Sequence, residues 1–260
     1  MRSIVSFNTL ILLLRSRASA IILARYFASR FGRVWSRIFP DRHWQAEVQN
    51  ARSVFERNTR GLTFSTTWFD GSIPVWVRLL SDLKNSKRAV DVLEIGSWEG
   101  RSTVFLLGFF PDGRVTAVDT WAGGDEYRNV AQLSTLEQRF DANVSTFRNR
   151  VIKLKGPSSA VLADIAARSR ECFDQILVDG SHFSDDVMLD AVFSWRLLRK
   201  DGILIFDDYL WRFERYAWKK NPATAVNAFL RLVHGDYTLL HVGHQLAIRK
   251  TVSIATYTDH

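Results

Sequence analysis

The chain has 260 residues, of which 47% are hydrophobic and 24% charged, and its formal net charge is +8. This composition is typical of a globular protein with one large or two small domains, and it excludes a disordered chain and a collagen-like repeat. The single cysteine, Cys172, excludes an intrachain disulfide framework and a thiolate zinc cluster, and it fits a reducing, cytoplasmic compartment.

The positive charge is concentrated at the N-terminus. Residues 1–40 contain seven arginines and no acids, which leaves a net charge of about +1 for the other 220 residues. A body so close to neutrality lacks the broad basic face that binds a phosphate backbone. We therefore expect no nucleic-acid partner.

Residues 1–65 are expected to form a basic, amphipathic helical arm. Its longest uncharged run, Ser3–Leu14, has 12 residues, fewer than the roughly 20 that a membrane-spanning helix needs. Ala24, Ala28 and Phe31 then recur at helical spacing, with arginines between them. Such an arm can pack on the body or on a partner subunit, lie on an anionic membrane surface, or act as a targeting segment. The sequence leaves these interpretations open.

From residue 66 to 260, short apolar runs alternate with longer amphipathic segments, which predicts one domain. The runs predict strands at 90–95, 115–118, 151–154, 176–178 and 203–206, and the intervening segments predict helices at 101–110, 132–148, 157–170 and 183–198. This alternation indicates a parallel sheet with helices on both faces. Two more strands, at 237–242 and 245–250, predict a closing hairpin around Gly243-His244.

Acidic residues recur at the carboxyl ends of the predicted strands, where sheets of this kind bind ligands. After the first strand, Gly96 and Gly100 allow a sharp turn close to a ligand, and a helix begins near Arg101. The turn lacks the Gly-x-Gly-x-x-Gly of dinucleotide-binding folds, and Glu94 would repel a pyrophosphate but suit an ammonium or a sulfonium. Asp119, after the second strand, is suited to accept hydrogen bonds from a ribose, with helix capping as the alternative.

Three aspartates, Asp179, Asp207 and Asp208, follow the fourth and fifth strands, which should be neighbours. Carboxylates that converge without a lysine or arginine beside them raise one another's pKa, and a divalent cation relieves this repulsion. Oxygen ligands suit Mg²⁺. The alternative is that Asp208 only caps the next segment. His182, three residues after Asp179, can accept a proton near neutral pH or can cap the helix that follows.

Five segments, VLEIGSWEGRST, VDTWAGGDE, ILVDGSHFSDDV, WRLLRKDGILIFDDYLW and HVGHQLAIRK, resemble in this order a class I S-adenosylmethionine-dependent methyltransferase. Within that superfamily the chain is similar to metal-dependent sugar O-methyltransferases of macrolide biosynthesis. The resemblance covers about residues 66–250. It implies an α/β, Rossmann-like sheet of seven strands with the last strand antiparallel, and S-adenosylmethionine and Mg²⁺ as cofactors.

The resemblance also implies a role for each candidate site residue. It implies cofactor contacts for Glu94, Gly96, Ser97, Gly100, Ser102, Asp119, Thr120, Trp121, Ser158 and Asp179, with the ribose at Asp119 and the adenine near Trp121 and Ser158. It implies metal binding by Asp179, Asp207 and Asp208, and catalysis by His182 as general base together with Asp179.

The expected function is therefore methylation of a hydroxyl group on a sugar or another small secondary metabolite. Three alternatives stay open: an N- or C-methyltransferase, a non-catalytic module held at a membrane by residues 1–40, and a nicotinamide-dependent oxidoreductase, which the missing dinucleotide motif disfavours. A homo-oligomer is a further partner that the sequence leaves open.

Some residues receive only a structural interpretation. Core or surface roles are expected for the histidines of the final hairpin region, His234, His241 and His244. Trp68-Phe69 and the segment 74–76 either line the substrate entrance or belong to the core. The loop at 123–126 is expected to cover the cofactor.

Overall fold

The computed structural model describes residues 7–38, 41–86, 88–124, 131–212 and 220–254. Its strands are β1 (Asp91–Ile95), β2 (Arg114–Asp119), β3 (Val151–Lys155), β4 (Phe173–Val178), β5 (Leu198–Phe206), β6 (Tyr237–Val242) and β7 (Leu246–Lys250). Its helices are α1 (Phe7–Arg15), α2 (Ala20–Ile38), α3 (Arg42–Thr59), α4 (Ile73–Asn85), α5 (Arg101–Phe109), α6 (Leu136–Val144), α7 (Ser158–Arg168), α8 (Ser184–Leu197) and α9 (Pro222–Leu232). Short 3₁₀ helices occupy Trp68–Ser72, Ala131–Thr135 and Ser145–Arg150.

The strands form one seven-stranded sheet in the order β3-β2-β1-β4-β5-β7-β6. Strand β7 is antiparallel to both of its neighbours, whereas the other pairs are parallel. This confirms the predicted Rossmann-like sheet with its last strand antiparallel. The direction of strand connection reverses between β1 and β4, so a ligand is expected at the carboxyl ends of these two strands.

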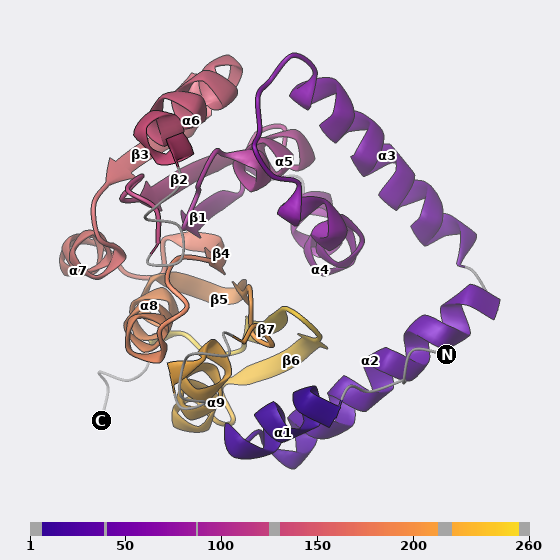
Figure 1. Cartoon of the computed structure of the whole chain (residues 1–260). Helices are drawn as coiled ribbons and strands as arrows, with labels where there is room; N and C mark the ends of the chain where they lie inside the picture. The colour runs from indigo at the N-terminus through magenta and orange to yellow at the C-terminus, as the bar shows by residue number, and fades with distance from the viewer. Residues whose placement is uncertain (1–6, 39–40, 87, 125–130, 213–219, 255–260) are drawn as a thin grey trace.

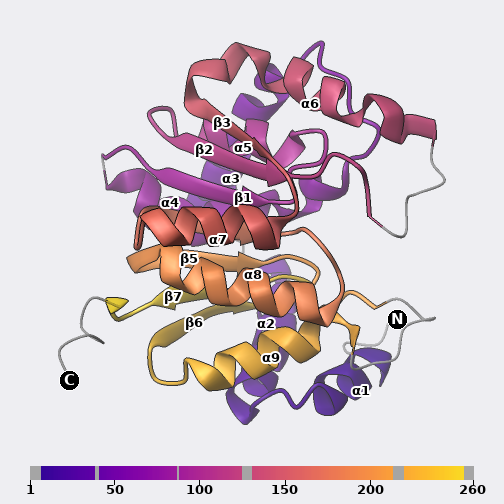
Figure 2. The same cartoon turned by 90° about the vertical axis from the view of Figure 1, so that its left-hand side faces the viewer.

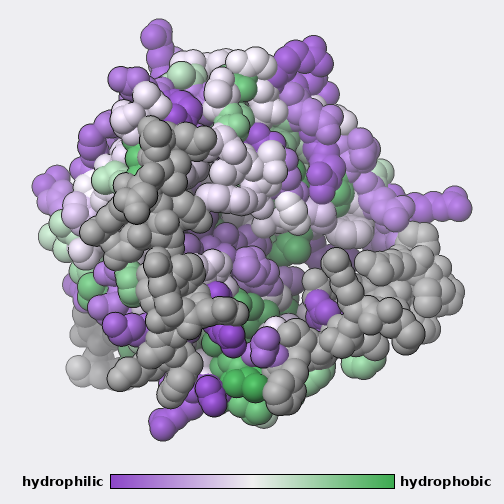
Figure 3. All heavy atoms as spheres, viewed as in Figure 1, coloured by the Kyte–Doolittle hydropathy of each residue, from purple (hydrophilic) through white to green (hydrophobic). Residues whose placement is uncertain are grey.

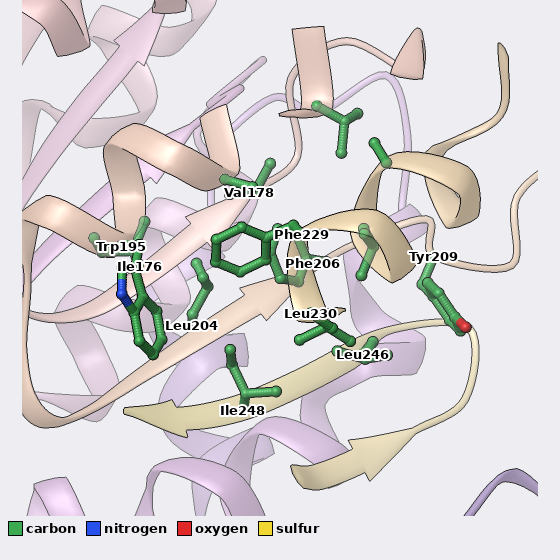
Figure 4. Close-up of a cluster of buried hydrophobic side chains, with 14 of the residues drawn as sticks. Ile176, Val178, Trp195, Leu204, Phe206, Tyr209, Phe229, Leu230, Leu246 and Ile248 are labelled. Atoms are coloured by element: carbon green, nitrogen blue, oxygen red, sulfur yellow. The ribbon is translucent and has the colours of Figure 1, made fainter. Parts of the chain in front are cut away.

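Helices cover both faces of the sheet (Figures 1 and 2). On one face α7, α8 and α9 pack together, and on the other α3 and α4 pack around α5. Alternation along β1 explains the two layers, since Leu93 belongs to the first core and Val92 to the second. In the first core, Phe229 packs edge-on against Trp195 and Phe206 at centroid distances of 5.9 Å (Figure 4). Such pairs hold the helices at a fixed position on the sheet.

The described part of the arm packs on the body. Leu13 and Tyr26 are buried in the first core. The hydroxyl of Ser29 donates to the carbonyl of Val242 in β6 over 2.8 Å, and Asn227 of α9 donates to Ser16 over 2.9 Å. Packing on the body is thus the interpretation that the structure supports for α1 and α2.

The third helix of the arm packs elsewhere. Whereas α1 and α2 lie against α9 and β6, α3 packs on α4 and α5 (Figure 1). The domain boundary at residue 65 stays a prediction. No helix in the described segments has the length and apolarity to cross a membrane. Hydrophilic residues make up most of the coloured surface on the face shown in Figure 3.

Three segments differ from the sequence-based expectation, and the first is helix α4, which is an addition to the predicted elements. The single helix expected at 132–148 is divided into a 3₁₀ turn, α6 and a second 3₁₀ turn, because the non-helical backbone of Thr135 precedes α6 (φ −117°, ψ 8°). Helix α9 is an addition to the predicted elements. Of the loop expected over the cofactor, residues 125–130 lie outside the described residues.

Candidate active site

The carboxyl ends of the parallel strands are aligned by backbone hydrogen bonds that continue each ladder by one residue. These bonds run from Gly96 N to Val118 O (2.8 Å), from Asp179 N to Ile95 O (2.8 Å) and from Asp207 N to Val178 O (2.9 Å). As a result, the residues that follow β1, β4 and β5 meet at one edge of the sheet. The structure therefore brings the predicted glycine turn and the predicted acids together.

Gly96 allows the turn after β1 to touch the loop after β4. Its backbone is left-handed (φ +88°), and a Cβ atom there would overlap the carbonyl oxygen of Asp179. Gly100 is also left-handed (φ +79°) and precedes the first residue of α5. Both glycines are thus required by the backbone geometry, and they point the amino end of α5 toward the turn.

Glu94 lies beneath this turn and has no exposed surface. The hydroxyl of Thr103 donates to its Oε2. Burial raises the pKa of Glu94 to about 7, an effect that hydrogen bonds from Ser102 and Thr103 partly offset. Because no atom of Glu94 is exposed, it supports the turn from below, and a ligand would contact it only after the turn shifts.

Asp119 organises the loops after β1 and β2. Its two carboxylate oxygens accept hydrogen bonds from the backbone amides of Trp98 (2.8 Å) and Trp121 (2.7 Å). Both tryptophans have positive φ angles, 47° and 49°, which are unfavourable for bulky side chains. The carboxylate stabilises both turns at once. Each of its oxygens has a second lone pair with which to accept a bond from a ligand.

The remaining cofactor candidates occupy different environments. The indole of Trp121 is buried, packs on Phe140 at a centroid distance of 4.8 Å and donates to the carbonyl of Trp98 over 3.0 Å. Ser97 is buried at the turn. Thr120 is exposed, and its hydroxyl accepts from the amide of Ala122 over 3.2 Å. Ser158 and Ser102 are half-buried at the amino ends of α7 and α5.

The acids after β4 and β5 form a cluster with His182. Asp179, His182 and Asp208 are half-buried, and each offers one ligand atom within 4.8 Å of the other two. Asp207 is also half-buried. The same four residues line a small cavity. The predicted catalytic and metal-binding residues are therefore neighbours in the structure.

The electrostatics of this cluster are those of crowded carboxylates. Burial raises the pKa of Asp179 well above its ordinary value, and the charges of Asp207 and Asp208 raise it further. Burial likewise raises the pKa of Asp207 to about 6, together with the charge of Asp208. Within the described residues no lysine or arginine forms an ion pair with Asp179 or Asp207. Three carboxylates with excess negative charge fit a hard divalent cation. The ligand atoms that lie within 4.8 Å of one another nevertheless belong to Asp179, His182 and Asp208, and Asp207 is outside that group.

Two histidines hold Asp208. His182 Nε2 lies 2.8 Å from Asp208 Oδ2, and His244 Nε2 lies 2.7 Å from Asp208 Oδ1. Burial raises the pKa of Asp208, but these two hydrogen bonds outweigh it, so that the pKa lies below its ordinary value. The ring of Trp211 stacks on His182 at a centroid distance of 4.3 Å. The imidazole of His182 is thus fixed between an indole face and a carboxylate.

Sequence reasoning missed several of these contacts. His244, for which we expect a core or surface role, is exposed, and its imidazole also contacts Asp208 of the acid cluster. The next residue, Gln245, donates to Asp207. Of the aromatic segments, Trp76 is buried in the core, whereas Trp68 is exposed beside Trp98 at a centroid distance of 6.0 Å. The segment HVGHQL contained a signal for the histidine contact, but only the pairing of β5 with β7 brings it to the acids.

The strand order and the single antiparallel strand, β7, define a class I methyltransferase fold. Residues 93–209 match the family model described as a methyltransferase domain. No protein of curated function matches the chain in sequence.

Solved structures of O-methyltransferases are similar to this chain in fold. The MycE methyltransferase of the mycinamycin biosynthetic pathway, in complex with Mg, SAH and mycinamycin VI, has a TM-score of 0.52 and 20% identity; the match covers 77% of this chain and 54% of MycE. An O-methyltransferase from Bacillus cereus in complex with SAH has a TM-score of 0.51 and 17% identity, with 88% and 100% covered. TomG from Streptomyces achromogenes, in complex with SAM, has a TM-score of 0.51 and 16% identity, with 79% and 90% covered. The chain thus spans about half the length of MycE.

Proposed function

We propose that this protein is an O-methyltransferase assisted by a divalent cation, which methylates a hydroxyl group of a sugar or another small metabolite. The observation that carries the proposal is the contact between the glycine turn and the acid cluster, because Gly96 packs directly on the carbonyl of Asp179. The same edge of the sheet therefore holds both the residues suited to the methyl donor and those suited to a cation. MycE, which was solved in complex with Mg and SAH, supports the same pairing.

The residues of the turn fit the donor. Asp119 has lone pairs for a ribose, the amino end of α5 points to the turn, and two glycines keep the backbone open to a ligand. S-adenosylmethionine supplies, when bound, an electrophilic methyl group on a sulfonium. Glu94 would support this loop from below and contribute negative charge near the cationic cofactor.

The acid cluster fits a cation and a proton acceptor. Asp179, Asp207 and Asp208 would hold Mg²⁺, which when bound lowers the pKa of a hydroxyl group beside it. His182 would take the hydroxyl proton. Asp208 accepts from Nε2–H of this imidazole in one tautomer, which leaves the basic lone pair on Nδ1, and Trp211 restrains the ring plane. The chain's contribution is then position and proton transfer.

The proposal is tested with the full chain by calorimetric titration of S-adenosylhomocysteine and of Mn²⁺, which reports on sites for Mg²⁺. We expect both to bind. Asp207→Asn should weaken Mn²⁺ binding by at least about tenfold and leave the affinity for S-adenosylhomocysteine unchanged. Asp201→Asn, which replaces an exposed aspartate of β5, the strand that precedes Asp207, is the matched control and should change neither. Equal Mn²⁺ affinity in Asp207→Asn and in the unaltered protein would refute the metal assignment.

Turnover separates the chemical alternatives. With a panel of hydroxylated sugars, formation of S-adenosylhomocysteine that EDTA suppresses supports the proposal. EDTA-insensitive turnover of amine or carbon acceptors would support an N- or C-methyltransferase instead. Binding of NAD(H) without S-adenosylhomocysteine binding would replace the proposal by an oxidoreductase.

A further inference from the structure

The turn between β6 and β7 reaches the acid cluster from a distant part of the sequence. Strand β7 pairs antiparallel with β5, with Leu246 opposite Phe206, so the residues just before β7 lie at the carboxyl end of β5. Two consecutive residues of this turn each contact one of the two aspartates that follow β5. His244 contacts Asp208, and Gln245 contacts Asp207.

Gln245 is buried, with 4% of its surface exposed, and its amide has partners at both ends. Its Nε2 donates to Asp207 Oδ1 and to the hydroxyl of Ser72 over 3.1 Å. Its Oε1 accepts from the indole N–H of Trp76 over 3.0 Å. Trp76 is itself 1% exposed and belongs to α4.

The chemistry of Trp76 sets the direction of this amide. An indole N–H is a donor only, so the group that faces it must be the oxygen of Gln245. The NH₂ group is thereby turned toward Asp207, whose carboxylate is an acceptor when ionised. A flipped amide would lose both bonds, because it would place N–H against N–H and oxygen against a carboxylate.

We propose that Gln245 is a positioning residue for the Asp207 carboxylate, and that Trp76 fixes the direction in which Gln245 donates. The inference rests on the proposed function, in which Asp207 binds the cation. Through Gln245, one oxygen of Asp207 is linked by hydrogen bonds to the buried indole of Trp76 in α4. The carboxylate therefore keeps one orientation in the cavity that it lines together with Asp179. Hydrogen bonds that hold a ligand in this way typically account for about 10- to 100-fold in metal affinity.

A simple core role for Gln245 makes a different prediction. If the amide only fills space, its replacement lowers the free energy of unfolding and leaves the affinity for a cation unchanged in the folded protein. The metal affinity, measured well below the unfolding temperature, therefore separates the two roles.

The experiment is a Mn²⁺ titration of the full chain, saturated with S-adenosylhomocysteine, followed by the electron paramagnetic resonance signal of free Mn²⁺. Gln245→Met keeps the volume and removes both polar groups, and we expect its Kd for Mn²⁺ to rise about 10- to 100-fold. Trp76→Phe removes only the N–H that directs the amide, and we expect a smaller rise of about 3- to 10-fold. Trp195→Phe is the matched control. It removes a buried indole from the other core and should leave the Kd unchanged.

The double variant tests the relay itself. If Trp76 acts through Gln245, Trp76→Phe combined with Gln245→Met binds Mn²⁺ no more weakly than Gln245→Met alone. Wild-type affinity in Gln245→Met, or fully additive losses in the double variant, would overturn the inference while leaving the metal site intact. Absence of Mn²⁺ binding in the unaltered protein would overturn the metal part of the proposed function, and the inference with it. Should Gln245→Met fail to fold, Trp76→Phe, which retains the glutamine, carries the test: a raised Kd supports the relay and an unchanged Kd overturns it.

Discussion

Replacing Glu94 by glutamine should stabilise the ligand-free protein at and above neutral pH. Glutamine keeps the shape of the side chain and an oxygen for the hydroxyl of Thr103, but it has no charge to bury. In the protein itself, a fully buried carboxyl group must ionise at neutral pH in a site where burial raises its pKa from 4.5 to about 7. The free energy of unfolding therefore depends on pH through this one group.

The sign and size of this pH dependence follow from the linkage between proton binding and folding. The folded-state pKa is raised, so the carboxyl group contributes stability that is fully present below pH 4.5 and is lost as the pH rises through about 7. At 1.36 kcal/mol for each pKa unit, the loss reaches about 3 kcal/mol at pH 8. Glutamine does not ionise, so the variant loses no stability at this position over the same pH range. The advantage of Glu94→Gln should thus grow between pH 4.5 and 7 and stay constant above.

Urea unfolding at pH 5, 6, 7 and 8 measures this difference. Glu56→Gln, in which an exposed glutamate of α3 is replaced, is the control and should show no difference that varies with pH. The difference in the free energy of unfolding between Glu94→Gln and the unaltered protein should grow with pH. A difference that is independent of pH, or that shrinks as the pH rises, would show that burial does not raise the pKa of Glu94 and would refute the reasoning.

Three further predictions concern the turn, the ribose candidate and the arm. Gly96→Ala should lower the free energy of unfolding by at least about 2 kcal/mol, because the left-handed backbone alone costs an alanine about 1–2 kcal/mol and its Cβ also overlaps Asp179; urea unfolding measures the loss, and unchanged stability contradicts it. Asp119→Asn leaves one acceptor for two backbone amides and should cost about 1–3 kcal/mol without any ligand, whereas a residue used only for ribose binding would cost nothing. Deletion of residues 1–38 should lower the thermal midpoint by more than about 5 °C, since each core side chain that is lost contributes about 1.5–3 kcal/mol. A truncated chain that melts like the full one, but no longer pellets with anionic liposomes, would support the membrane interpretation of the arm instead.

The order of strands and helices could be predicted because the information is local. Apolar runs of three to six residues, such as Val115–Val118 before Asp119, indicate buried parallel strands. The convergence of Asp179 with Asp207 and Asp208 follows from the same pattern, since neighbouring parallel strands end at one edge. The convergence of these site residues could therefore be predicted without knowing any side-chain contact.

The rest depends on information that a linear pattern lacks. The contacts of His244 and Gln245 require the antiparallel register of β7 against β5. The role of Glu94 depends on how deeply it is buried, because the same carboxylate on an open surface would meet a ligand directly. Helix α9 is a different case, because Pro222 in its first turn and the helical spacing of Val226, Phe229 and Leu230 are signals that the sequence contained.

The packing of α2 on β6 has a consequence for how the protein behaves at high concentration. Strand β6 is the outermost strand on its side of the sheet, and a bare outermost strand offers its peptide groups to another chain. Ser29 already occupies the carbonyl of Val242, so the arm ends the ladder with a side-chain hydroxyl where a foreign strand could otherwise add. At the opposite margin, Lys153 and Lys155 of β3 form ion pairs with Glu137 and Asp141, which hold α6 beside this strand. Removal of the arm would therefore expose β6, and self-association through that strand is the expected result.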